Sequence, residues 1–211
     1  MSPSTELTPK LSHMQPAKLR QRWHDPDFSS SAVEAMAKLI SSRELQGPLD
    51  LRGIAIGAVT PIAGLPVFNL FRTHLSKVDL SCAQIEGSMA EAVFDQVHFD
   101  QSRLSHVSAA KTRFRSCTFD GSTLRLKADD ARFESCSFRG AKFIASASLT
   151  EWGGRRVLFA QCDFSGASFR RQEFRASTFE QCTFDGCVFD QCDLRGAKFL
   201  GESPQLEQCM V

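Results

Sequence analysis

The chain has 211 residues, of which 42% are hydrophobic, and a formal net charge of +1. This length suffices for one sizeable core, and no apolar run of about 18 residues suggests a membrane span. Residues 1–49 carry six Lys or Arg and five Asp or Glu, and residues 50–211 carry nineteen of each. Neither part is a polyanion or a polycation, so a nucleic acid is not the expected partner. A secretory signal pattern is also missing, which makes the cytoplasm the expected location.

The first 49 residues are expected to form a flexible N-terminus followed by a capping helix. Prolines and scattered basic residues occupy the first half, a composition that favours a flexible chain. Residues 29–44 carry apolar side chains at helical spacing, and Ser31 with Glu34 forms a capping-box pattern. A Gly-Pro pair at position 47 marks the end of this helix. Its apolar face is predicted to cover the N-terminal end of the domain that follows.

A repeat of five residues dominates residues 50–200. A large apolar residue, which we call the centre, recurs every fifth position, and fifteen of the 18 Phe residues are centres. The position two before each centre is usually Ala, Ser, Thr or Cys. The longest unbroken run of centres is Phe159, Phe164, Phe169, Phe174, Phe179, Phe184, Phe189, Leu194 and Phe199. Such a period indicates a repeat architecture.

One large and one small residue per repeat are predicted to point inward, and the other three outward. A chain that turns a corner every five residues closes a four-sided coil after twenty. Neighbouring coils then pair at the spacing of about 4.8 Å that separates strands in a sheet. A single coil buries too little apolar surface to be stable, so the coils must stack into a solenoid.

Three segments carry a resemblance to a known family. "CSFRGAKF" (136–143), "CDFSGASF" (162–169) and "CDLRGAKF" (192–199) resemble the pentapeptide repeat family, whose pattern is A-(D/N)-L/F-x-x. The resemblance covers roughly residues 70–200. It implies an all-β solenoid, a right-handed quadrilateral β-helix, to which the sequence adds a short α-helical N-terminal cap.

Breaks in the repeat divide the chain further. The register loses one residue after Ile85 and another after Leu124. It gains residues within 144–158, which we interpret as an insertion loop. The gain is either one residue added to the repeat or, the preferred interpretation, a loop of eleven residues. The Pro-containing stretch 57–71 is expected to be a packed connector, and residues 201–211 to leave the register and cap the C-terminal end.

Several residue types are candidates for sites of chemistry. Cys182, Cys187 and Cys192 recur at a spacing compatible with zinc ligands, but successive centres lie on successive faces, so these thiols cannot converge. We interpret them as small core residues in a reduced protein. The five histidines fall on outward or terminal positions, and a flat solenoid wall offers no pocket that excludes water. We therefore predict no catalytic residue, no cofactor, no metal and no enzymatic activity.

The candidate binding residues are Trp152, Arg155, Arg156, Arg175 and Arg195. Trp and Arg are the residue types that dominate binding energies at protein interfaces. Trp152 either packs back onto the solenoid or anchors a partner. By register, Arg175 stacks on Arg195, a repulsive pair that a partner could neutralise.

Three functions are compatible with these features. The first is a bacterial, non-enzymatic protein that blocks another protein, either a toxin or an enzyme, in the manner of an immunity protein; the chain itself would be a monomer or a weak dimer. The second, implied by the resemblance, is a DNA mimic that protects or inhibits a type II topoisomerase, which needs a strongly negative surface. The third is a secreted effector or scaffold. The balanced charge favours the first.

Overall fold

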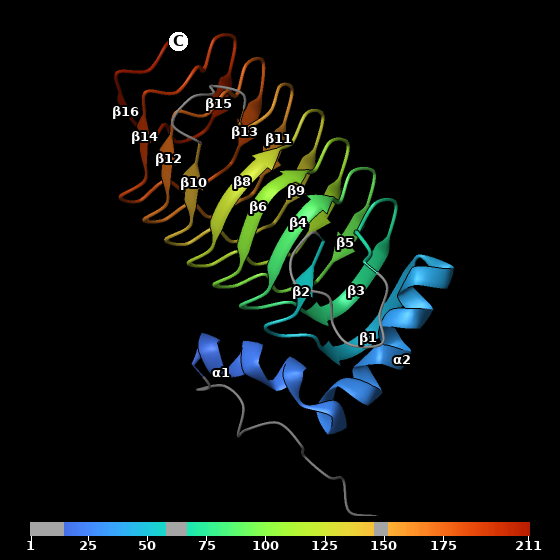
Figure 1. Ribbon diagram of the computed structural model, residues 1–211. Coiled ribbons are helices and arrows are strands. Elements are labelled where there is room, and N and C mark those ends of the chain that lie inside the picture. Colours follow the sequence, from blue (N-terminus) through green and yellow to red (C-terminus); the bar gives the residue numbers. More distant parts are fainter. Residues whose placement is uncertain (1–14, 58–66, 146–151) are drawn as a thin grey trace, which may run out of the picture.

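The computed structural model shows an elongated parallel β-solenoid with helices at its N-terminal end (Figure 1). It describes residues 15–57, 67–145 and 152–211. The predicted all-β solenoid with an α-helical N-terminal cap is confirmed. None of the helices in these ranges has both the length and the hydropathy that a membrane span requires.

Two walls of the solenoid are eight-stranded parallel sheets. The first sheet contains, in spatial order, β1 (Glu44–Asp50), β3 (His74–Asp79), β5 (Val93–Asp95), β7 (Arg113–Arg115), β9 (Arg132–Glu134), β11 (Leu158–Ala160), β13 (Thr178–Glu180) and β15 (Lys198–Leu200). The second sheet contains β2 (Ala55–Ile56), β4 (Gln84–Ser88), β6 (Arg103–Ser108), β8 (Thr123–Lys127), β10 (Lys142–Ile144), β12 (Ser168–Arg170), β14 (Val188–Asp190) and β16 (Gln205–Glu207).

Two narrower walls separate these sheets and are held by single parallel bridges. The third face is the series Asp79, His98, Thr118, Ser137, Asp163 and Thr183. The fourth face is the series Lys127, Gly153, Glu173, Asp193 and Met210. The chain visits the first sheet, the third face, the second sheet and the fourth face in turn, which gives four sides to each coil.

The period of five has a backbone cause at the corners. A residue with positive φ follows each of the last centres by two positions, at Ala176, Gln181, Gly186, Gln191 and Gly196, with φ between 52° and 70°. This left-handed conformation turns the chain from one wall to the next, and it is one that glycine adopts without strain. Three outward residues per repeat are thus two wall positions and one corner.

Ladders of phenylalanine fill the interior. Below the first sheet, Phe114 stacks on Phe133 at 4.5 Å between ring centroids, with an interplanar angle of 2°. Below the second sheet, Phe169 lies 4.1 Å from both Phe143 and Phe189. Rings of adjacent ladders meet edge to face, as Phe164 and Phe169 do at 5.4 Å. The core is therefore closed by stacked contacts within each ladder and edge-to-face contacts between ladders.

The cysteines are small core residues, as predicted. Cys117, Cys136, Cys162 and Cys182 are buried free thiols, and each donates to the carbonyl oxygen of a Phe centre, for example Cys182 to Phe159 at 3.5 Å. Burial raises the pKa of Cys136 and Cys162 well above the ordinary thiol range. A raised pKa keeps these thiols protonated and unreactive.

The N-terminal cap is more ordered than the sequence suggested. Residues 16–24, predicted to be flexible, form α1 (Pro16–Gln21) and a 3₁₀ turn (Arg22–His24). Burial of Leu19 and Trp23 accounts for this order, and Trp23 Nε1 also donates to the carbonyl of Arg52 at 2.8 Å.

Helix α2 (Pro26–Ser42) begins three residues before the predicted start at 29, so Ser31 is not its N-cap. Its Met36 and Leu39 join the core cluster beside β1. The strand β1 contains the Gly-Pro pair, so the solenoid begins at Glu44, ahead of the predicted boundary at residue 50.

The insertion is shorter than expected. Phe133 pairs in register with Phe159, so this coil has 26 residues where an ordinary coil has 20. Within the predicted loop 144–158, Gly153 already pairs with Lys127 and Glu173. The rest of the loop, 146–151, lies outside the described residues, as do most of the connector, 58–66, and residues 1–14.

The C-terminal segment leaves the five-residue register, as predicted, because Leu206 pairs with Phe189 at a separation of 17 residues and not 20. Residues 201–211 still belong to the solenoid, because β16 pairs with β14. Cys209 donates to the Phe189 carbonyl at 3.2 Å. The segment therefore continues the coil.

Candidate functional site

The fourth face gathers the five candidate residues at the end of the solenoid that carries residues 152–211. Bridges place Gly153, Glu173 and Asp193 one above another. Two positions further along each strand, on the other side of a buried centre, come Arg155, Arg175 and Arg195. Because residues i and i+2 of an extended chain point to the same side, each acidic residue shares the outer wall with an arginine.

A chain of ion pairs runs along this wall. Arg155 Nε lies 2.8 Å from Glu173 Oε1, and Arg175 Nε lies 3.2 Å from the same oxygen. Arg175 Nη2 then contacts Asp193 Oδ2 at 2.6 Å, and Arg195 Nη2 contacts that oxygen at 2.7 Å. Three guanidinium groups therefore alternate with two carboxylates.

This arrangement corrects the expected repulsion between Arg175 and Arg195. The two arginines do stack one coil apart, since the Ala176 N–H donates to the Arg195 carbonyl at 3.0 Å. However, the carboxylate of Asp193 binds both side chains, so the two arginines do not form an uncompensated repulsive pair. The sequence contains the signal, because "EFR" at 173–175 and "DLR" at 193–195 place an acid and an arginine on one wall.

Asp193 is the most buried carboxylate in this chain of ion pairs. The residue is 7% exposed, whereas the arginine side chains that bind it are 39% and 52% exposed. The side chain of Arg195, through Nε at 2.9 Å and Nη2 at 2.7 Å, holds the pKa of Asp193 well below its usual range, and Arg175 adds to this effect. The carboxylate is charged at neutral pH and fixes the orientation of both arginines.

Arg156 lies at the corner between the fourth face and the first sheet. It has positive φ, and its Nε and Nη2 bind the two carboxylate oxygens of Asp130 at 2.7 and 2.8 Å. Its side chain is 60% exposed. The guanidinium is therefore held in place by one acid and open to solvent on its other side.

Trp152 packs against the solenoid and is 7% exposed. Its ring meets the ring of His106 edge on, at 5.4 Å between centroids, and the Lys127 ammonium lies 5.9 Å above it. The indole Nε1 is buried and has no acceptor in the structure. Of the two interpretations of this residue, packing onto the solenoid is the one that the structure shows, so Trp152 supports the wall rather than protruding from it.

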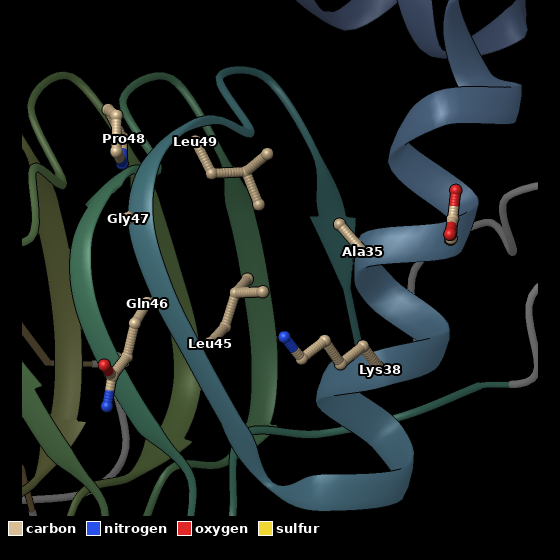
Figure 2. Close-up of a pocket in the computed structure, with 8 residues that line it drawn as sticks. Ala35, Lys38, Leu45, Gln46, Gly47, Pro48 and Leu49 are labelled. Atoms are coloured by element: carbon tan, nitrogen blue, oxygen red, sulfur yellow. The ribbon is translucent and has the colours of Figure 1, made fainter.

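A groove at the opposite end was not anticipated from sequence. It has a volume of about 410 Å³ and lies between α2 and β1, where Leu45 and Leu49 point toward Ala35 and Lys38 (Figure 2). Glu34, Gln46, Gly47 and Pro48 complete its lining. Its charged groups are one Glu and one Lys, without a nucleophile and base pair, so the groove offers no catalytic constellation.

Other chemistry-bearing residues do not converge. Over the ranges that the structure describes, no three His, Cys, Asp or Glu side chains form a group suited to a metal ion. Of the outward histidines, His98 shares a hydrogen bond of 3.0 Å with Thr118 Oγ1, and His106 contacts Trp152. Burial alone raises the pKa of Cys187 to about 12, which suits a structural thiol and not a nucleophile.

Comparison with known proteins identifies the repeat. Residues 155–201 match the family model "Pentapeptide repeats (9 copies)". No curated protein matches the sequence. Among solved structures, a trypsin-treated variant of QnrB1, a plasmid-mediated fluoroquinolone resistance protein, is 15% identical, with a TM-score of 0.46 over 77% of this chain and 89% of that chain. The pentapeptide repeat protein HetL from Nostoc sp. strain PCC 7120 is 12% identical, with a TM-score of 0.30 over 83% and 92%.

Proposed function

The chain is a pentapeptide repeat protein, and from that premise we propose that it acts without catalysis, by binding another protein through its outer walls. The bound protein would be blocked or neutralised because its own surface is covered. An immunity-type inhibitor of a bacterial toxin is the specific form of this function that we propose, because the charges of the outer walls are balanced.

The ion-pair chain of the fourth face carries this proposal. Rigid arginines lose less conformational entropy when they bind than free ones, and here Glu173 and Asp193 hold Arg155, Arg175 and Arg195 in fixed positions while leaving them 39–55% exposed. The exposed N–H groups can donate to carbonyl or carboxylate oxygens of a partner. Alternating charges at strand spacing suit the mixed surface of a folded protein.

The same wall argues against DNA mimicry. Duplex DNA carries one negative charge per about 1.7 Å, and a mimic needs a comparable density of carboxylates. On the fourth face, each acid that belongs to the chain of ion pairs is bound by an arginine, and residues 50–211 balance nineteen charges against nineteen. Protection of a topoisomerase is therefore the weaker hypothesis, and so is the secreted effector, which has no supporting contact in the described residues.

The test is chemical cross-linking of the tagged full chain in the native host, followed by identification of the bound protein. Arg156→Glu and Arg195→Glu should each abolish the cross-link, because both guanidiniums are exposed and held by acids. Arg139→Glu is the matched control, since Arg139 pairs with Asp163 on the third face and is 67% exposed. An equal yield of the same product in all three variants would exclude the fourth face as the interface.

A further inference from the structure

Two stacked arginines on the first sheet lack the compensation that the fourth face shows. Arg113 on β7 and Arg132 on β9 are direct register partners, and both are exposed. Across the described residues, neither guanidinium has an ion pair or a side-chain hydrogen bond. Like charges directly opposite each other on one sheet destabilise it, so this pair is a local cost that the fold does not offset.

Other exposed arginines of the two sheets either have a counter-charge or have no like-charged register partner, as Arg115 and Arg103 show. Arg115, two residues after Arg113, pairs with Glu134 at 3.2 Å. On the second sheet, the unpaired Arg103 has Gln84 and Thr123 as register partners, so no like charge stands beside it. Arg113 and Arg132 combine both features, a like-charged neighbour and no counter-charge.

Apolar side chains lie at both ends of the pair. The same outer column of the first sheet reads Val93, Arg113, Arg132 and Leu158 in spatial order. Val93 and Leu158 are partly exposed. An arginine pair flanked by two aliphatic residues has the composition of an interface centre from which neighbouring contacts exclude water.

We propose that this column, defined as Val93, Arg113, Arg132 and Leu158, binds an acidic amphipathic helix of a partner protein. The proposal deepens the protein-binding function and rests on it. Three strand spacings of about 4.8 Å separate Val93 from Leu158, which gives a length of about 14 Å. On an α-helix, positions i and i+10 lie about 15 Å apart, with i+3 and i+7 between them on the same face. A helix with Leu at i and i+10 and Glu at i+3 and i+7 therefore matches the column in order, length and charge.

A nucleic acid fits the same column less well. The adjacent outer column of the sheet contains three acids, Asp95, Glu134 and Glu180, and one arginine, Arg115, and its net negative charge would repel the phosphates of a duplex laid across the wall. A helix meets the arginines with two carboxylates and needs no further cations. The charge pattern thus selects a protein segment.

The experiment measures fluorescence anisotropy of a labelled 18-residue helical peptide with this Leu, Glu, Glu, Leu spacing, titrated with the full chain. Exposed pairs contribute little individually, so we expect weak binding that Arg113→Gln/Arg132→Gln weakens about tenfold. Arg115→Gln, on the same sheet but paired with Glu134, should change the affinity less than about twofold. A peptide with Gln in place of both Glu should bind as weakly to the wild type as the acidic peptide binds to the double variant.

Three outcomes would overturn the proposal: no binding of the acidic peptide, equal binding by the double variant, or tighter binding of a duplex DNA of the same length. The first two leave the fourth-face function standing, because its test uses Arg156→Glu and Arg195→Glu and a cross-linked partner. An unchanged cross-link in those variants together with the expected peptide binding would instead remove the fourth face and retain the helix-binding column.

Discussion

Replacing Asp193 by Asn tests whether the fourth face is held by charge. The carboxylate accepts hydrogen bonds from Arg175 and Arg195 at 2.7–2.9 Å, and hydrogen bonds to charged groups contribute about 1.5–3 kcal/mol each. Both arginines are partly solvated, so the sum must be discounted for screening. We expect Asp193→Asn to lower the free energy of unfolding by about 1–2 kcal/mol at pH 7.

The pH dependence separates charge from packing. The pKa of Asp193 is depressed in the folded chain, chiefly by Arg195, so its contribution is fully present above the ordinary aspartate value of about 3.9. It is lost as the pH falls below that value toward the folded-state pKa. Urea denaturation should therefore show a difference between the wild type and Asp193→Asn that is constant from pH 7 to about pH 5 and shrinks steadily from about pH 4 to pH 2.

Asp190→Asn serves as the control for this measurement. Asp190 lies 3.4 Å from Arg170 with its side chain 31% exposed, and we expect a loss below about 0.5 kcal/mol, as for exposed pairs in general. A difference between wild type and Asp193→Asn that stays constant from pH 7 to pH 2 would refute the electrostatic account, since packing effects do not titrate.

Further predictions concern the core and the corners. Phe169→Ala should lower the free energy of unfolding, measured by urea denaturation, by about 3–5 kcal/mol, because the ring stacks on a neighbour on both sides. An unchanged urea midpoint would exclude the ladder. Gly186→Ala should lower the free energy of unfolding by about 1–2 kcal/mol, since only the positive φ of this residue opposes a side chain. Gly153→Ala should prevent folding of its coil, because the new Cβ would meet Glu173 O at 2.3 Å. Equal melting temperatures of the two variants would contradict this difference. Iodoacetamide should label partly exposed Cys209 before buried Cys136, and mass spectrometry showing the reverse order would contradict the assigned burial.

The architecture could be predicted because one physical rule repeats. Large residues at every fifth position predict the Phe ladders, and the small position two before each centre predicts the buried cysteines. The count of four repeats to a coil fails where a coil departs from twenty residues. A count of twenty does not relate Cys136 to Cys162, because their coil has 26 residues, as the pairing of Phe133 with Phe159 shows.

The candidate site was predicted less well because its first repeat on the fourth face has no large residue at the centre position. The centre of that repeat on the fourth face is Gly154, which packs against the Ala128 backbone so closely that a Cβ would lie 2.6 Å from it. A rule that seeks large centres therefore assigns Trp152 and Gly153 to a loop. The ion pairs were missed for a different reason, because stacking was considered only within one column, whereas Glu173 and Asp193 belong to the column beside the arginines.

Compensation of charge is the property that distinguishes one wall position from another in this fold. The interior is filled by aromatic, aliphatic and small side chains, so the charged groups lie on the walls, and every wall repeats the same backbone geometry. Where acids of the adjacent column neutralise stacked arginines, as along the fourth face, the charges orient side chains and stabilise the coil. Where they do not, as at Arg113 and Arg132, the unfavourable pair persists at a cost to stability. A bound acidic helix would offset that cost, and Arg132→Gln should relieve it in the free protein.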